Sequence, residues 1–282
     1  TLLRTYPGAD GVKIGWTRRA GHTIVASAVR GGRRLLAVLL GSTARDADAA
    51  RLCDEQNSLI PAVLAEVCAH LSLPLIQHSS SFVFDGAKVH PYDEEETANP
   101  VCRYGLSKWY GERSIRDTLP RHVILRTDWV FSSLDSGYFQ RHIENCKARH
   151  GNLGVMNNRF SPTPAHDVAR VLLAISQQVD CAAEVWGTYH YCAQQPLAQE
   201  IFVEQLLQEA AKYDADVAAA LVGLKIVRQP VQLPYIANSV VNGQKLFDTF
   251  GIKPRSRSSA LTALIRQLYL QPDRKSTRLN SS

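Results

Sequence analysis

Residues 73–84 read Leu-Pro-Leu-Ile-Gln-His-Ser-Ser-Ser-Phe-Val-Phe, a short apolar run that leads into three hydroxyl side chains. Such a run is typical of a buried parallel strand, and α/β folds carry their site residues at the carboxyl ends of these strands. The following stretch 104–119 has helical character and stops at Pro120, because proline cannot continue a helix. Together the two stretches predict one strand–helix unit of an α/β fold.

The predicted helix carries a tyrosine and a lysine four positions apart, Tyr104 and Lys108. Residues at this spacing share one face of a helix, so the lysine ammonium lies near the phenol and favours its ionised form. A phenol tuned in this way is a usable acid near neutral pH. The pair often occurs by chance, so its weight comes from the hydroxyl-rich strand end before it and from Gly111-Glu112 after it.

Strands and helices continue to alternate after this unit. The predicted strands are 122–126 and 186–192, and the predicted helices are 137–149, 167–179, 197–213 and 258–270. Asp167 has a side chain suited to cap the N-terminus of the second of these helices. The alternation predicts a layered α/β fold with a small C-terminal lobe.

Several motifs follow one another in order. They are Asn99-Pro100 before the Tyr-x-x-x-Lys helix, Leu-Arg-Thr-Asp-Trp-Val-Phe at 125–131, Arg-Phe-Ser-Pro-Thr at 159–163, and Asn238-Ser239. This order resembles the extended short-chain dehydrogenase/reductase superfamily, most closely its dTDP-4-dehydrorhamnose reductase branch, over residues 55–273. The resemblance implies a Rossmann-like parallel sheet with a small C-terminal substrate lobe, and NAD(P)H-dependent reduction of a 4-keto sugar nucleotide.

The resemblance also implies roles for five residues. Tyr104 donates a proton to the carbonyl oxygen, Lys108 lowers the pKa of that phenol, and Ser80 hydrogen-bonds the carbonyl. Tyr104 and Lys108 also contact the cofactor, NADPH or NADH. Trp129 lies against the sugar, and Asn238 contacts the nucleotide. Plainer interpretations stay open for Ser80, as a partner of the backbone, and for Trp129, as core filler.

Members of this superfamily open with a strand and a G-x-x-G-x-x-G turn, whose amides hold the dinucleotide pyrophosphate at a helix N-terminus. Residues 1–282 contain no such turn. We therefore expect a truncated sheet and weak NADPH binding by this polypeptide, which would leave it inactive as a reductase. A non-catalytic sugar-nucleotide-binding or regulatory subunit is the alternative from another class.

The first 53 residues resemble a different family. Residues 10–15 (Asp-Gly-Val-Lys-Ile-Gly) and the strand-like stretches 22–29 and 35–41, joined by Gly31-Gly32, resemble the Lys-Thr-Gly-box region of a serine D-alanyl-D-alanine carboxypeptidase. Ile14 stands at the Thr position, and the stretch has no Ser-x-x-Lys nucleophile box. The resemblance thus implies a remnant that cannot form an acyl-enzyme. A plain β-hairpin module is the alternative.

These observations divide the chain into three expected parts: a β fragment at 1–53, an incomplete reductase-like domain at 54–273, and a tail at 274–282. The tail is polar and has no apolar period. It resembles a translated sequencing adapter, with a natural solvated tail as the alternative. The join near Cys53 suggests a chimeric fragment.

The net charge of +6 is distributed unevenly. Residues 1–53 carry nine Lys+Arg and three Asp+Glu, whereas residues 54–273 carry 20 and 23. The reductase-like body therefore has no basic stripe, and we expect no nucleic-acid partner. No apolar run approaches the roughly 20 residues that span a bilayer, so we expect no membrane partner and a cytoplasmic location.

The six cysteines form no C-x-x-C pair, which is typical of free thiols in a reducing cytoplasm. His142, Cys146 and His150 repeat at a four-residue spacing in a predicted helix. Because no second ligand cluster accompanies them, we interpret this stripe as chance and expect no metal. The expected small-molecule partner is a sugar nucleotide, and a homodimer stays open.

Overall fold

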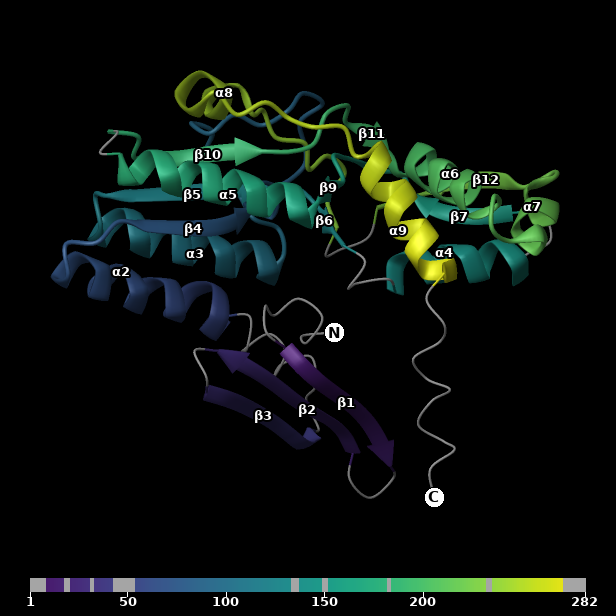
Figure 1. Ribbon diagram of the computed structural model, residues 1–282, viewed down its shortest axis with the longest axis horizontal. Helices are drawn as coiled ribbons and strands as arrows, with labels where there is room; N and C mark the ends of the chain where they lie inside the picture. The colour runs from purple at the N-terminus through teal and green to yellow at the C-terminus, as the bar shows by residue number, and fades with distance from the viewer. Residues whose placement is uncertain are drawn as a thin grey trace. The chain divides into compact units, whose positions relative to one another are not determined.

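A computed structural model describes residues 9–17, 21–30, 33–42, 54–132, 137–148, 152–181, 184–231 and 235–270 (Figure 1). The chain divides into two compact units, Thr1–Gln56 and Asn57–Ser282. The expected tail at 274–282 and the expected join at Cys53 lie outside the described residues.

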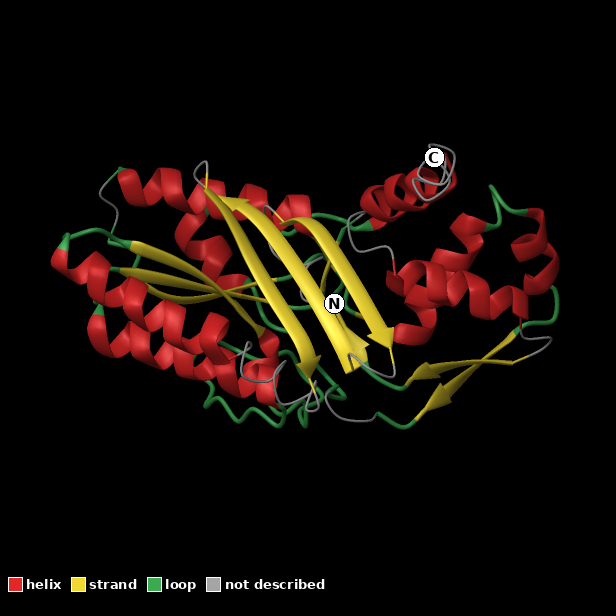
Figure 2. Cartoon of the chain, turned by 90° about the horizontal axis from the view of Figure 1, so that it is seen from below, coloured by secondary structure: helices red, strands yellow, loops and turns green. Residues whose placement is uncertain are grey.

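The first unit contains an antiparallel sheet of three strands in the order β1-β2-β3. The strands are β1 (Ala9–Thr17), β2 (Gly21–Arg30) and β3 (Arg33–Ser42), drawn as the three long arrows in Figure 2. Arg30 pairs with Arg33, so Gly31 and Gly32 stand between two paired strands. The antiparallel pairing of β2 with β3 is the strand arrangement that the predicted hairpin requires.

The second unit is built on a parallel sheet of three strands in the order β10-β5-β4. These are β4 (Leu75–Ser80), β5 (His122–Thr127) and β10 (Gly187–Tyr191). Thr127 pairs with Ser80 on one side and with Tyr191 on the other. The carboxyl ends of all three strands therefore meet at one edge, as the predicted Rossmann-like α/β fold requires.

Helices cover both faces of this sheet, and the alternation of side chains along β5 explains how. Ile124 faces a cluster with α2 (Ile60–His70) and α3 (Arg103–Thr118), while Val123 and Leu125 face α5 (Ala165–Asp180). Figure 1 shows α2 and α3 beside β4. All six residues of β5 are buried. This strand is therefore the middle strand of the sheet and is covered by helices on both faces.

A second core, built from aliphatic side chains and a group of aromatic rings, forms the C-terminal lobe. Its helices are α4 (Gly137–Ala148), α6 (Gln199–Ala210), α7 (Ala215–Leu221) and α9 (Ser258–Leu270), and its parallel strand pair is β7 (Asn152–Met156) with β12 (Lys225–Gln229). The short strands β6 (Val130–Phe131), β8 (Arg159–Phe160), β9 (Thr163–Pro164) and β11 (Leu197–Ala198) connect the sheet to this lobe, and α8 (Gln244–Phe250) packs beside β10.

The predicted elements of the second unit are confirmed, but the predicted cap of α5 is wrong. The helix begins at Ala165, with Pro164 at the N-cap position and no side-chain cap. Asp167 lies inside the first turn, where its carboxylate accepts hydrogen bonds from Arg170 and from the Tyr191 hydroxyl. The buried tertiary partners of Asp167 thus determine its role, rather than the local capping preference.

Two further observations bear on the expected partners. In the described part of the chain, no helix is both long and apolar enough to cross a membrane. Of the spaced His-Cys-His stripe, His142 and Cys146 are buried on α4, and His150 lies outside the described residues.

Candidate active site

The sheet edge at the end of β4 determines where α3 begins. After Ser80 the chain forms a 3-10 turn, η2 (Ser81–Val83), and the Ser80 hydroxyl accepts a hydrogen bond from the Phe82 amide at 3.3 Å. Gly105, in the first turn of α3, lies against the Phe82 carbonyl, because a Cβ at this glycine would be only 1.9 Å from that oxygen. The absent side chain lets the two backbones touch and fixes the start of α3 against η2.

Tyr104 and Lys108 lie together on α3, as the sequence predicts. The Lys108 Nζ is 5.9 Å from the centre of the Tyr104 ring and donates to the carbonyl oxygen of His78 on β4 at 3.5 Å. Tyr104 is 40% exposed and meets the Phe82 ring edge to face, with 5.9 Å between the ring centres. The phenol is thus accessible, and the ammonium lies close to it.

Ser80 is buried at the carboxyl end of β4, with 6% of its surface exposed. Its hydroxyl caps η2 through the bond to Phe82, whose ring also contacts Tyr104. The structure therefore brings Ser80 and Tyr104 to the same strand end through Phe82. The backbone role that the sequence leaves open for Ser80 is present here, and a hydroxyl that accepts one bond still has a proton to donate.

His78 is part of this site and was missed from the sequence. Its Nε2 lies 2.8 Å from the Thr127 hydroxyl. Burial, with help from the positive charge of Lys108, lowers the pKa of His78 to about 4. A neutral imidazole therefore lies beneath Lys108 at neutral pH, and a histidine at the polar end of the 73–84 run is the only sequence signal for it.

Asn57 was also missed. It lies in a short π-helix, η1 (Glu55–Leu59), and its side-chain amide donates to the Ser107 hydroxyl at 3.2 Å. That hydroxyl donates in turn to the backbone carbonyl of Tyr104 at 2.8 Å. π-Helical turns occur often at functional sites, and this one ties the helix before β4 to the helix that carries the Tyr–Lys pair. No pattern in the sequence marks it.

Trp129 lies just beyond β5, half-buried among the aromatic side chains of the lobe. Its ring centre is 4.7 Å from that of Tyr138, and four phenylalanine rings surround it: Phe131, Phe139, Phe160 and Phe202. Both roles considered for Trp129 are compatible with this position, since aromatic packing fixes one side of the ring and its surface is not fully covered.

Asn238 is buried, and its amide is engaged with the backbone. The Nδ2 donates to the carbonyl oxygens of Lys88 at 2.9 Å and His90 at 3.1 Å, and the Oδ1 accepts from the Val240 amide. The side chain thus joins two segments that are about 150 residues apart in the chain. Its place is near the loop that follows η2, and its hydrogen bonds organise that loop.

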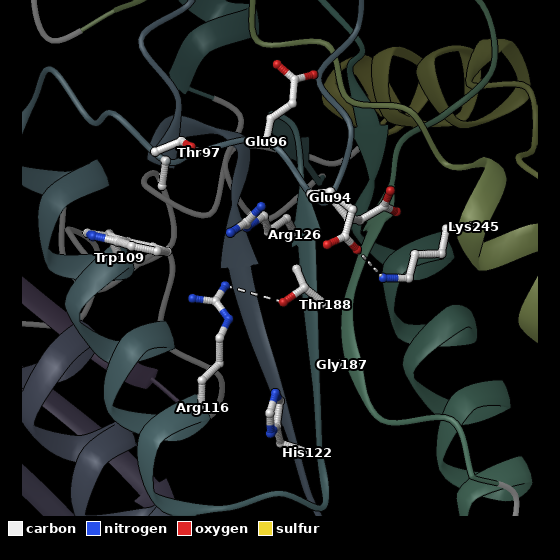
Figure 3. A pocket seen from close by; sticks show the side chains of 12 residues that line it. Glu94, Glu96, Thr97, Trp109, Arg116, His122, Arg126, Gly187, Thr188 and Lys245 are labelled. Atoms are coloured by element: carbon white, nitrogen blue, oxygen red, sulfur yellow. Dashed lines mark hydrogen bonds and ion pairs between the residues drawn. The ribbon is translucent and has the colours of Figure 1, made fainter.

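A pocket of about 530 Å³ lies beside α3 and does not include Tyr104, Lys108 or Ser80 in its lining. Figure 3 shows Trp109 and Arg116 on one wall and Lys245 on the other. The charged side chains here pair with protein groups: Arg116 donates to the Thr188 hydroxyl at 3.3 Å, and Lys245 donates to Glu95 at 3.0 Å.

The chain is similar to known proteins over most of its length. The family model described as "RmlD substrate binding domain" matches residues 45–270. The dTDP-4-dehydrorhamnose reductase of Sinorhizobium fredii (strain NBRC 101917 / NGR234) is 29% identical over 217 residues, which cover 74% of this chain and 71% of that protein. The enzyme of the same name from Aggregatibacter actinomycetemcomitans is 29% identical over 201 residues, or 70% and 68% of the two chains.

Solved structures show the same fold. A crystal structure of a dTDP-4-dehydrorhamnose reductase from Clostridium acetobutylicum superimposes with a TM-score of 0.64 at 24% identity, covering 80% of this chain and 78% of that one. The Bacillus anthracis enzyme of that name, in complex with NADP, gives a TM-score of 0.57 at 19% identity, with coverage of 75% and 70%. At these identities the likeness supports the fold alone.

Proposed function

Because this chain belongs to the RmlD substrate binding domain family, we propose that its second unit carries the site of an NAD(P)H-dependent reductase of a 4-keto sugar nucleotide, similar to dTDP-4-dehydrorhamnose reductase. One observation carries the proposal: Tyr104 and Lys108 share one face of α3, above the carboxyl end of β4, and the phenol is accessible. A sugar carbonyl needs a positioned acid on its oxygen in order to be reduced.

In this proposal Tyr104 gives its phenolic proton to the carbonyl oxygen as negative charge develops there. Lys108 lies close enough to stabilise the phenolate that remains. The Ser80 hydroxyl accepts from the Phe82 amide, which leaves its single proton available to donate to the same carbonyl oxygen. The His78 carbonyl, which accepts from Lys108, holds the ammonium in place.

The residues present fit one end of the cofactor. Lys108 and Tyr104 would hold the ribose next to the nicotinamide, since an ammonium and a phenol at a sheet edge suit a diol. When bound, NADPH supplies the hydride for the carbonyl carbon. Residues 1–282 contain no glycine-rich turn that could bind the pyrophosphate of the cofactor. We therefore propose that this polypeptide by itself holds the cofactor weakly.

The substrate side of the site would lie toward the C-terminal lobe. Trp129 offers the uncovered part of its ring to the sugar, and Asn238 shapes the loop at Lys88 and His90 that would border the nucleotide. Proteins named dTDP-4-dehydrorhamnose reductase match this chain over most of their length, and a dTDP-linked sugar is therefore the proposed substrate.

The test is a fusion in which the N-terminal nucleotide-binding half of the Sinorhizobium fredii reductase replaces residues 1–54. We expect the fusion to oxidise NADPH when a dTDP-4-keto-6-deoxy sugar is added. Tyr104→Phe should then lower kcat by about two orders of magnitude, the usual scale for a positioned acid. Lys108→Met should weaken both turnover and NADPH affinity.

Tyr110→Phe provides the matched control, because Tyr110 is an exposed tyrosine on the same helix, and this variant should keep the activity of the fusion. A folded fusion whose Tyr104→Phe variant reduces the sugar as fast as its parent would contradict the catalytic pair. A fusion that binds the dTDP-sugar but never reduces it would favour the non-catalytic binding subunit.

A further inference from the structure

Asp128 follows β5 directly and is 4% exposed. Its Oδ1 accepts a hydrogen bond from the Trp129 amide at 2.8 Å and a longer one from the Ser81 hydroxyl at 3.4 Å. Its Oδ2 accepts from the Ser161 amide, and the Ser239 hydroxyl also interacts with the carboxylate. A single buried carboxylate thus collects hydrogen bonds from four parts of the second unit.

Those four parts surround the proposed substrate side of the site. Ser81 is the neighbour of Ser80 in η2, and Trp129 is the proposed sugar platform. Ser161 lies between β8 and β9, and Ser239 follows Asn238. Because each segment is far from the others in the chain, no local structure holds them together. Asp128 is the group on which they converge.

The chemistry of the partners identifies the form of Asp128 that suits this position. Two partners are backbone amides, one on each carboxylate oxygen, and an amide N–H can only donate. The carboxylate therefore needs two accepting oxygens. An ionised aspartate has two accepting oxygens. A protonated aspartate would present its hydroxyl, a poor acceptor, to one of the two amides, and an asparagine would present an NH2 group, which is a donor.

Burial opposes the ionisation of Asp128, so the charge on its carboxyl group depends on pH near neutrality. Burial raises the pKa of Asp128 to about 7, although the hydrogen bonds from Ser239, Ser161, Trp129 and Ser81 act in the opposite direction. Among the described residues, the titratable side chain that interacts with it is the Cys192 thiol, whose pKa burial raises to about 12, so this thiol is neutral throughout the physiological range.

We propose that Asp128 is a positioning residue of the sugar-nucleotide site: its ionised carboxylate holds Ser81, Trp129, Ser161 and Ser239 in the binding arrangement, and ligand affinity follows its ionisation. This inference rests on the proposed function of the second unit. It adds a residue that acts through Trp129 and the Ser80–Ser81 turn rather than by touching the reacting atoms.

The test measures the dissociation constant of dTDP-glucose by calorimetry between pH 5.5 and 8.5, with the full 282-residue chain. This ligand is chosen because its diphosphate has no terminal phosphate that titrates near pH 6. If only the ionised form binds, affinity should fall about tenfold between pH 8 and pH 6. Ser81→Ala removes one donor, which raises the pKa of Asp128 and should move the midpoint of this profile to higher pH.

Asp128→Asn should bind dTDP-glucose at least tenfold more weakly at pH 8 and should lose the pH dependence. Asp117→Asn, at an exposed site on α3, is the matched control and should behave like the parent. Near-ultraviolet circular dichroism reports whether each variant is folded. If Asp128→Asn does not fold, the profiles of the parent and of Ser81→Ala still decide the question.

The outcomes separate the two proposals. Failure of the parent to bind dTDP-glucose at any pH would overturn the proposed function, and this inference with it. Binding that is independent of pH, or a folded Asp128→Asn with the affinity of the parent, would overturn the role of Asp128 and leave the proposed function intact.

Discussion

Arg126 and Glu112 form a two-point ion pair in the interior of the second unit. Arg126 Nε donates to one carboxylate oxygen at 2.9 Å, and Arg126 Nη2 donates to the other at 2.7 Å. The side chains are 2% and 1% exposed. Glu112 lies one helical turn after Lys108 on α3, and Arg126 is on β5, so the pair fastens the helix of the Tyr–Lys site to the central strand.

Replacing Arg126 with Met should lower the free energy of unfolding at pH 7 by about 3 to 5 kcal/mol, because the buried Glu112 carboxylate then keeps Arg116 as its one charged partner among the described residues. Burial raises the pKa of Glu112, but the hydrogen bond and charge of Arg126 and the charge of Arg116 hold it below the usual value. Because the pKa of Glu112 is lower in the folded than in the unfolded state, its ionised form stabilises the fold at pH values above the unfolded pKa. This stabilisation is lost as the pH falls. The deficit of the variant should therefore shrink below about pH 4.5.

Urea unfolding at pH 4 and pH 7 measures this difference. Glu112→Gln in the Arg126→Met background should recover part of the loss, since the orphaned charge is removed. Arg113→Met, which breaks an exposed ion pair on the same helix, should change stability by less than about 0.5 kcal/mol. An Arg126→Met protein as stable as its parent at pH 7 would show that the pair does not fasten α3.

Gly105→Ala should destabilise the protein by about 1 to 3 kcal/mol, although alanine is the better helix former by about 1 kcal/mol. The reason is steric: the new Cβ would meet the Phe82 carbonyl oxygen at 1.9 Å, so α3 must move away from η2. Thermal or urea unfolding provides the measurement. Ser114→Ala, at a half-buried position of α3, is the control and should be neutral or slightly stabilising. A stabilised Gly105→Ala variant would refute the close backbone contact.

His142→Leu should stabilise the protein more at pH 5.5 than at pH 8. Burial, assisted by Arg141, lowers the pKa of His142 to about 4, and its Nδ1 has no hydrogen-bond partner in the described part of the chain. Because the pKa of His142 is lower in the folded state, the protein loses stability as the pH falls below about 6.5, the pKa of this side chain in the unfolded state. The variant should gain about 1 to 1.5 kcal/mol relative to the parent between pH 8 and pH 5.5.

Free energies of unfolding at the two pH values give this result directly. Gln140→Leu, at an exposed position on the same helix, adds an apolar group without removing a titrating one and should leave the pH dependence unchanged. Equal gains for His142→Leu at pH 5.5 and pH 8 would mean that His142 is not held neutral by the fold.

Calorimetric titration of the 282-residue polypeptide with NADPH should show no saturable binding below the millimolar range. The glycine-rich turn that would present several amides to the pyrophosphate is not among these residues. The fusion with the Sinorhizobium fredii N-terminal half is the positive control and should bind NADPH. Tight, saturable binding by the polypeptide alone would contradict this expectation.

The sequence by itself determined the local parts of this protein. The run at 73–84 predicts β4, the Tyr–Lys spacing predicts two side chains on one helix face, and the predicted helix 258–270 has the bounds of α9. Each of these features depends on residues that are close together in the sequence. Their geometry follows from helical and strand periodicity, which a sequence displays directly.

Only the tertiary structure decided which distant residues meet. Asp128 lies 47 residues from Ser81 and 33 from Ser161 in the chain, and Asn238 joins a loop about 150 residues before it. The parallel register of β4 and β5 brings the Ser81 segment beside Asp128, and that register depends on burying both faces of the sheet at once. The same burial raises the pKa of the Asp128 carboxyl to about 7, and this burial depends on segments that are far apart in the sequence.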